Sequence, residues 1–423
     1  MKAIKLRLII MNFLEFAVWG AYLTSMGAYL AKIGMGTNIG WFYSVQGIVS
    51  LFMPALIGIL ADRFIPAQKM LGICHLLAAG FMTIAGYMGM TYGDQASFGQ
   101  LFPFYALSVA FFMPTIALGN SVSYNALTKA GLDTVKHFPP IRVFGTIGFI
   151  VSMWIVDLLG FQHDHRQFFV CAAWGLILGI YSFTLPNCPI NKLAEKKGFV
   201  DAFGLRAFAL FKEKRMAVFF IFSMFLGVSL QITNGYANTF ISSFADIPAF
   251  SDTFAVKHAN ILISLSQISE TLCILLIPFC LKRFGIKKVM LIAMFAWVLR
   301  FAFFGAGNPG GGVWLFILSC IVYGVAFDFF NISGSLFVDK ETDESIRSSA
   351  QGVFMMMTNG FGATIGTLCA QAIVNSMVYS KTEPLDQMAA WSNTWYIFAA
   401  YALVVAILFA ILFKYKHNPE QKQ

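Results

Sequence analysis

Apolar runs long enough to cross a lipid bilayer recur along the whole chain of 423 residues. A helix needs about 20 predominantly apolar residues to span the hydrocarbon core. Length alone would indicate roughly two or three soluble domains, but the repeated runs override that estimate. The composition agrees, because 58% of the residues are hydrophobic, only 12% are charged and the mean hydropathy is +0.72, far from a soluble globular protein. The sequence therefore predicts an all-α, polytopic membrane protein.

We expect twelve transmembrane helices, six on each side of a long polar connection. They lie at about 8–31, 39–60, 70–91, 99–127, 139–159, 167–185, 216–243, 258–281, 289–307, 313–338, 348–378 and 391–413. The plan predicts an N-terminal six-helix bundle (1–190), a cytoplasmic linker (191–215) and a C-terminal six-helix bundle (216–423). Glycines gather in the eleventh segment, where small residues allow close helix packing and local bending.

Most of the 29 Lys and Arg residues fall on one side of the expected membrane, together with both chain termini. Because Lys and Arg accumulate in cytoplasmic loops, this asymmetry predicts that both termini are cytoplasmic. The net charge of +9 is then a topology signal, and no nucleic-acid partner is expected. The first apolar run continues past Tyr29, too long for the apolar region of a signal peptide, so we expect it to be retained.

No enzyme and no metal site or other cofactor is predicted. The chain lacks HExxH spacing and a nucleophile–base pair. Its seven cysteines show no CxxC spacing and indicate small core residues rather than disulfides. The densest histidine cluster, His163-Asp164-His165, lies in a short outer loop and is interpreted as solvated.

A carboxylate stands in the middle of the tenth apolar run, IVYGVAFDFFNISGS at 321–335. Placing Asp328 in hydrocarbon costs at least a few kcal/mol, so it must face protein or a water-filled cavity. In a helix, Tyr323 and Phe327 are spaced i, i+4 and share a face beside Asp328. An aromatic wall flanked by an acid suits a flat ligand with hydrogen-bonding groups. The alternative is that Asp328 is only a structural partner for a buried arginine.

Other expected spans repeat this pattern of polar side chains at helical spacing. Gln231 and Asn234 are spaced i, i+3, and so are Gln267 and Glu270. Any single amide could instead join two helices, but the coincidence of amides and acids at compatible depths predicts one shared central site. Amides suit the edges of a nucleobase and carboxylates suit sugar hydroxyls.

The fifth span carries Arg142, Thr146 and Phe149 at i, i+4 and i+7, and the first span carries Glu15. Counting 1.5 Å per residue puts Arg142 and Glu15 toward the cytoplasmic side. A large anionic substrate would require more than one interior cation, so phosphorylated substrates are disfavoured.

The segment Gly58-Ile59-Leu60-Ala61-Asp62-Arg63-Phe64 resembles the G-x-x-x-D-R signature of the major facilitator superfamily, and 281–285 resembles a degenerate copy. The residues that usually follow are replaced by Ile65, Pro66 and Ala67. The resemblance implies two six-helix bundles with a site near the bilayer midplane.

Longer segments resemble bacterial permeases of the nucleoside–proton symporter family, a branch of that superfamily. These segments are FPPIRVFGTIGFI at 138–150, LQITN at 230–234, SQISETL at 266–272, 321–335, and AQG through MTNGFG at 350–362. The resemblance implies that the substrate site is lined by Arg142, Thr146, Phe149, Gln231, Asn234, Gln267, Glu270, Tyr323, Phe327 and Asp328. Glu15 departs from the family pattern, in which glutamine is expected.

The resulting hypothesis is uptake of nucleosides by proton symport through alternating access, by a monomer in the bacterial inner membrane. The proton would sit on Asp328 or Glu270, with Arg142 as a switch partner and Glu15 as a further candidate for coupling, since a change in solvation shifts a carboxylate pKa by several units. Purine or pyrimidine preference, and sodium in place of the proton, stay open. The alternatives are a proton-coupled sugar porter and a drug exporter.

Overall fold

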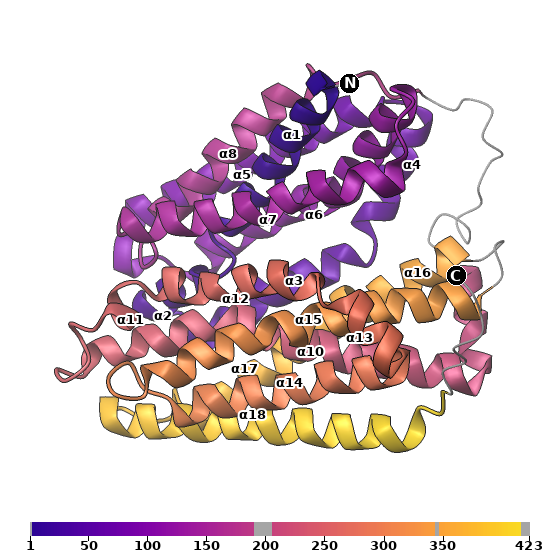
Figure 1. The fold of residues 1–423 in the computed structure, drawn as a ribbon. Helices are drawn as coiled ribbons and strands as arrows, with labels where there is room; N and C mark the ends of the chain where they lie inside the picture. The colour runs from indigo at the N-terminus through magenta and orange to yellow at the C-terminus, as the bar shows by residue number, and fades with distance from the viewer. Residues whose placement is uncertain (1, 190–204, 343–346, 416–423) are drawn as a thin grey trace. The chain divides into compact units, whose positions relative to one another are not determined.

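All regular structure in the described part of the chain is helical. The structure, a computed structural model, describes residues 2–189, 205–342 and 347–415. These residues form two compact units, Met1–Phe203 and Gly204–Gln423 (Figure 1). Most of the expected linker, 191–204, lies outside the described residues.

The first unit contains eight α-helices among its described residues. They are α1 (Lys2–Gly20), α2 (Met26–Lys32), α3 (Ile39–Ser50), α4 (Met53–Arg63), α5 (Ala67–Tyr92), α6 (Phe98–Lys129), α7 (Thr134–Leu158) and α8 (Arg166–Ser182). Two short 3₁₀ turns, Gly36–Asn38 and Gly93–Gln95, connect them. The element α7 begins earlier than the expected span, so that Pro139 and Pro140 lie inside the helix rather than at its start.

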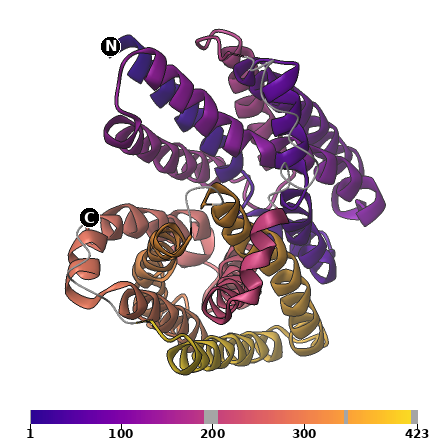
Figure 2. The ribbon, with the colours of Figure 1, turned by 90° about the vertical axis from the view of Figure 1, so that its right-hand side faces the viewer.

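The second unit begins with the 3₁₀ segment η3 (Leu205–Lys212) and contains the remaining described helices. They are α10 (Lys214–Ser243), α11 (Phe254–Lys257), α12 (Ala259–Ile274), α13 (Ile277–Phe284), α14 (Ile286–Ala306), α15 (Val313–Glu341), α16 (Arg347–Met355), the π-helix η5 (Met356–Gly362), α17 (Ala363–Met377) and α18 (Pro384–Leu412). A 3₁₀ turn, Phe244–Asp246, follows α10. Figure 2 views this unit nearly along its helices, with α18 in yellow.

Helical residues occupy each of the twelve expected segments. Among the described residues, eight helices are long and apolar enough to cross a membrane by themselves, and the bent pair α12–α13 makes a ninth. The other expected spans fall short of this measure because the first is interrupted between Gly20 and Met26, the second breaks at Leu51 and Phe52, and α8 has 17 residues. The prediction of an all-helical membrane protein is confirmed.

Close backbone contacts hold α1 against α7 in the first unit. A Cβ atom at Gly148 would overlap the backbone of Phe13, and one at Gly20 would overlap the backbone of Phe149. Glycine therefore lets these two helices approach more closely than any larger residue would. The helices α1 and α5 each pack on both α6 and α8, so these four helices surround a common interior.

In the second unit, α15 packs against both α12 and α14. A Cβ atom at Gly324 of α15 would lie 2.6 Å from the backbone and hydroxyl of Ser269 on α12, so glycine brings these helices into contact. The eleventh segment behaves as expected only in part. Gly362 and Gly366 pack against α10, whereas Gly352 meets open space. The segment also contains the π-helix η5, a local widening that is often found near functional sites.

Candidate functional site

The helix α15 carries a rigid aromatic surface. The rings of Tyr323 and Phe327 are nearly parallel, with centroids 6.0 Å apart and planes 10° apart, as their i, i+4 spacing requires. Trp297 of α14 meets Tyr323 edge to face at 5.9 Å. Tyr323 is buried and Phe327 is half-buried. The pair therefore offers a fixed flat face against which a planar ring can pack.

Two carboxylates lie close to this aromatic surface. Tyr323 interacts electrostatically with Glu270 of α12 and with Asp328 of α15. Asp328 is only 5% exposed, and Glu270 is half-buried. The contact between Gly324 and Ser269 sets the spacing of the two helices that carry these groups. The structure thus places Glu270 of α12 near Tyr323 and Asp328, which lie on one helix, α15.

A buried arginine joins the three helices that carry the predicted polar residues of this unit. Arg300 of α14 is fully buried and donates a 2.7 Å hydrogen bond to the Ser319 carbonyl. It also donates to the hydroxyls of Ser266 and Thr233, at 3.3 and 3.4 Å. Its guanidinium carbon lies 4.7 Å from the centroid of the Tyr323 ring, a cation–π distance. Sequence analysis did not assign Arg300 to the site, although an arginine inside an apolar run was a signal for it.

Two amide side chains next to these contacts have unused acceptors. Gln231 is 6% exposed and Gln267 is 9% exposed. The side-chain oxygen of each has no hydrogen-bond partner among the described residues. Buried polar atoms nearly always have partners, so exceptions require an explanation. Among the described residues neither oxygen bonds to another helix, so each keeps an unused acceptor position. Asn234, on the same helix as Gln231, is half-buried.

The remaining predicted residues, Arg142, Thr146 and Phe149, belong to α7 of the first unit. The Arg142 guanidinium lies over the ring of Phe16, 3.7 Å from its centroid. Phe149 is buried and its backbone contacts Gly20, whereas Thr146 is half-buried. A cation held over an aromatic ring keeps its charge partly desolvated.

In the described part of the chain, the Glu15 carboxylate contacts a histidine and a threonine. Its Oε2 atom lies 2.7 Å from Nε2 of His75 on α5. The Thr115 hydroxyl on α6 lies 2.5 Å from the other carboxylate oxygen and 2.5 Å from the Phe112 carbonyl oxygen, and its single hydrogen can serve only one of them. All three residues are buried. Sequence analysis missed His75, although a histidine well inside an apolar run was a signal for a partner of Glu15.

The outer histidine cluster is partly buried rather than solvated. Asp164 accepts hydrogen bonds from the backbone and side chain of Arg166, both at 2.8 Å, at the start of α8. Hydrogen bonds from Arg166 hold the pKa of Asp164 below its usual range although partial burial opposes the shift. Burial and nearby Lys32 lower the pKa of His163 to about 4. The cluster therefore forms a local structural contact at the end of a helix.

Apolar helices that enclose carboxylates, an arginine and amide oxygens without partners among the described residues define the class of a polytopic membrane transporter with the major facilitator fold. Residues 1–418 match the family described as "Nucleoside H+ symporter", and the chain belongs to this family. It is 48% identical over 418 residues to the nucleoside permease NupG of Escherichia coli strain K12, covering 98% of this chain and 97% of that one.

A second relative is the xanthosine permease of the same strain, 46% identical over 422 residues, with 99% of this chain and 98% of that one covered. The crystal structure of nucleoside transporter NupG matches with a TM-score of 0.86 at 47% identity, covering 98% of this chain and all of that one. The maltose permease of Geobacillus stearothermophilus is a distant relative, 24% identical over 84% of each chain. The predicted family and fold are confirmed.

Proposed function

We propose that this protein takes up nucleosides across the bacterial inner membrane by proton symport through alternating access, with both termini in the cytoplasm. Membership of the nucleoside–proton symporter family supports the substrate and the coupling ion. The charge asymmetry of the loops supports the orientation. The observation that carries the proposal is the pair of buried amide oxygens, on Gln231 and Gln267, without partners among the described residues.

The nucleobase is proposed to pack against Phe327 and the Tyr323 ring, whose planes are nearly parallel. The free oxygens of Gln231 and Gln267 would accept hydrogen bonds from ring or exocyclic N–H groups. Ribose hydroxyls would donate to Glu270. By their resemblance to the family, Asn234 of the same unit, and Arg142, Thr146 and Phe149 of α7, are also proposed as substrate-binding residues. A nucleoside without phosphates fits, because a polyanion would meet two carboxylates in a low-dielectric environment.

The coupling proton is proposed to reside on Asp328 or Glu270. Both carboxylates interact with the same phenol, and a carboxyl group moved between wet and dry surroundings changes its proton affinity strongly. By its resemblance to the family, Arg142 of α7 is proposed as a further residue of the coupling. Loading a proton neutralises one carboxylate and lowers the cost of burying it when the site closes off from water.

The test is the substitution Asp328→Asn in proteoliposomes with an imposed pH gradient. We expect the variant to exchange labelled uridine across the membrane but not to concentrate it. Asp386→Asn, which changes an exposed carboxylate near the start of α18, is the matched control and should accumulate uridine normally. If Asp328→Asn vesicles still concentrate uridine when driven by the gradient, Asp328 is not the proton carrier.

The alternative function is a proton-coupled sugar porter, because the maltose permease is a distant relative of this chain. Excess adenosine should block uridine uptake, whereas free hexoses should not. Competition by hexoses in place of adenosine would favour the sugar porter.

A further inference from the structure

The first unit contains a buried ionisable pair that the nucleoside site does not use. Glu15 of α1 is 3% exposed, and His75 of α5 is completely buried. Their atoms Oε2 and Nε2 are 2.7 Å apart, a hydrogen-bond distance that requires a proton on one of the two atoms. The Thr115 hydroxyl of α6 lies 2.5 Å from Oε1. Three helices thus converge on one carboxylate–imidazole pair.

The pair has room for a second proton. Nδ1 of His75 is buried and has no hydrogen-bond partner among the described residues. With one proton between Oε2 and Nε2, the pair is a carboxylate and a neutral imidazole, and its net charge is −1. A second proton, on Nδ1 of His75 or on the Glu15 carboxyl, leaves the pair with net charge 0. The pair therefore takes up or releases one proton between these two states.

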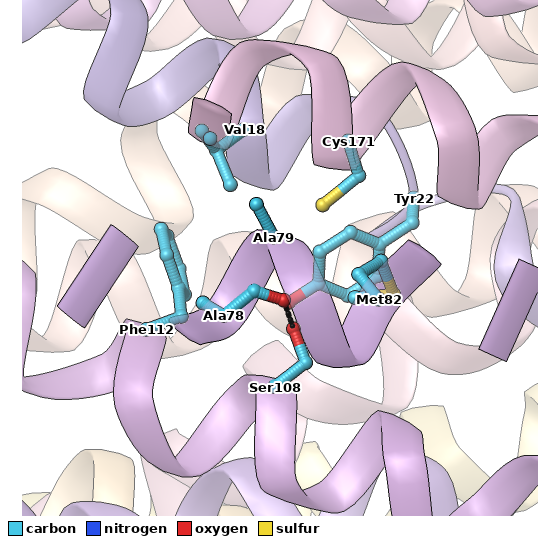
Figure 3. A pocket seen from close by; sticks show the side chains of 9 residues that line it. Val18, Tyr22, Ala78, Ala79, Met82, Ser108, Phe112 and Cys171 are labelled. Atoms are coloured by element: carbon cyan, nitrogen blue, oxygen red, sulfur yellow. Dashed lines mark hydrogen bonds between the residues drawn. The ribbon is translucent and has the colours of Figure 1, made fainter. Parts of the chain in front are cut away.

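The surroundings of the pair favour the state without net charge. The ring of Phe112 lies edge-on to the His75 ring, with centroids 6.0 Å apart. One helical turn away, a cavity of about 10 Å³ lies among α1, α5, α6 and α8, large enough for about one water molecule. Figure 3 shows its lining, with Val18 on the α1 turn after Glu15 and Ala78 on the α5 turn after His75. An uncompensated charge in such a place costs several kcal/mol.

Few other ionisable groups face the pair from the packed helices. Cys74 adjoins His75 and interacts with Glu15, and Cys171 of α8 lines the cavity. Tyr22 of α1 lines the same cavity, and its ring packs edge-on against Tyr105 of α6. From α7, Arg142 lies over Phe16, the residue after Glu15. The thiols and phenols are neutral at physiological pH. The protonation of Glu15 and His75 therefore determines the local charge next to Phe16, the ring that Arg142 covers.

We propose that Glu15 and His75 form a second proton-binding site, separate from the carboxylates of the second unit, and that turnover requires the protonated, uncharged pair. The proposal rests on nucleoside–proton symport as the activity. Loss of the proton leaves a net negative charge among α1, α5 and α6, which any rearrangement of these helices must carry through an apolar interior. Exchange of nucleoside should therefore fall at the high pH at which the pair no longer holds this proton.

The experiment measures uridine counterflow at equal internal and external pH, over a series of pH values, in proteoliposomes of the full chain. Glu15→Gln retains a side chain that accepts from Thr115 and donates to His75, but it stays neutral at high pH. For this variant we expect the pH at which counterflow falls to be higher by more than about one unit than for the unchanged protein. One pH unit corresponds to a free-energy difference of about 1.4 kcal/mol. Ser123→Ala is the control, since it removes a buried hydroxyl between α1 and α6 without a titratable group, and the pH at which its counterflow falls should not change.

The proposal is overturned if Glu15→Gln and the unchanged protein lose counterflow at the same pH. Should the variant fail to fold, ¹⁵N-histidine NMR of the unchanged protein in lipid decides the question. One solvent-protected imidazole must titrate over the range in which counterflow falls, and the absence of such an imidazole refutes the site. Failure of the symport activity itself appears differently, as an unchanged protein that never concentrates uridine under a pH gradient.

Discussion

The contact between α12 and α15 yields a quantitative prediction for Gly324→Ala. A Cβ atom at position 324 would lie 2.6 Å from the carbonyl carbon, the carbonyl oxygen and the hydroxyl oxygen of Ser269. Ordinary contacts need about 3.5 Å, so the helices must separate by roughly 1 Å. Ser269 also donates to the Ile321 carbonyl, and this hydrogen bond would lengthen. The added methyl group therefore changes the distance between Glu270 and the aromatic surface formed by Tyr323 and Phe327.

The expected size of the effect follows from overpacking and from misplacement of the site. Inserting a methylene-sized group into a packed interior costs about 1–3 kcal/mol. Each 1.4 kcal/mol that is lost from binding weakens affinity about tenfold. We therefore expect Gly324→Ala to lower the melting temperature and to weaken nucleoside binding by about tenfold or more.

The assay combines thermal unfolding in detergent with calorimetric binding of uridine and adenosine. Gly352→Ala is the matched control, because a Cβ atom there meets open space in the same unit. Alanine is the better helix former, so this control should be neutral or stabilised by up to about 1 kcal/mol. If both variants melt and bind alike, the close approach of Gly324 to Ser269 does not determine the geometry of the site.

Two further predictions concern buried charge and pH. Arg300→Lys keeps a buried cation, but lysine cannot reach Thr233, Ser266 and Ser319 together. Each hydrogen bond inside a membrane protein contributes about 0.6 kcal/mol. The variant should therefore have a free energy of unfolding that is lower by about 1–2 kcal/mol. Chemical denaturation in detergent checks this, with the exposed Arg283→Lys as control, and equal stability of the two variants would contradict it. Burial and nearby Lys32 lower the pKa of His163 from 6.5 to about 4 in the folded protein. Between these two pH values the unfolded chain binds a proton at His163 that the folded protein does not bind. The free energy of unfolding should therefore fall as the pH drops from about 6.5 toward 4. Between pH 7.5 and pH 5 the melting temperature should therefore fall less for His163→Gln than for the unchanged protein. The corresponding difference in the free energy of unfolding is on the order of 1–2 kcal/mol at pH 5. Equal falls in melting temperature would refute the assignment.

Sequence reasoning reached the helices and the family because both depend on local patterns. Hydropathy over about 20 residues predicts a membrane helix whatever it packs against. The same reasoning picked out Asp328 and Glu270, since a carboxylate in an apolar run is costly wherever the run lies. Helix interruptions, such as the one before Met26, were not predicted, because apolar residues continue through them.

The partner of each buried polar group was decided by the tertiary structure. Glu15 meets His75 and Thr115, which are 60 and 100 residues away along the chain. Arg300 likewise contacts α10, α12 and α15 at once. Which side chains meet depends on the rotation and depth of each helix, and these are determined by close contacts such as Gly324 on Ser269.

By itself, then, the sequence determined that this chain is a bundle of membrane helices with costly polar groups inside, because the bilayer imposes the same requirement on every segment. Only the packing of the helices decided that a histidine pairs with Glu15 and that Arg300 lies against the Tyr323 ring. The physical reason is that burial in lipid is a property of each segment, whereas a hydrogen bond requires two atoms at one place.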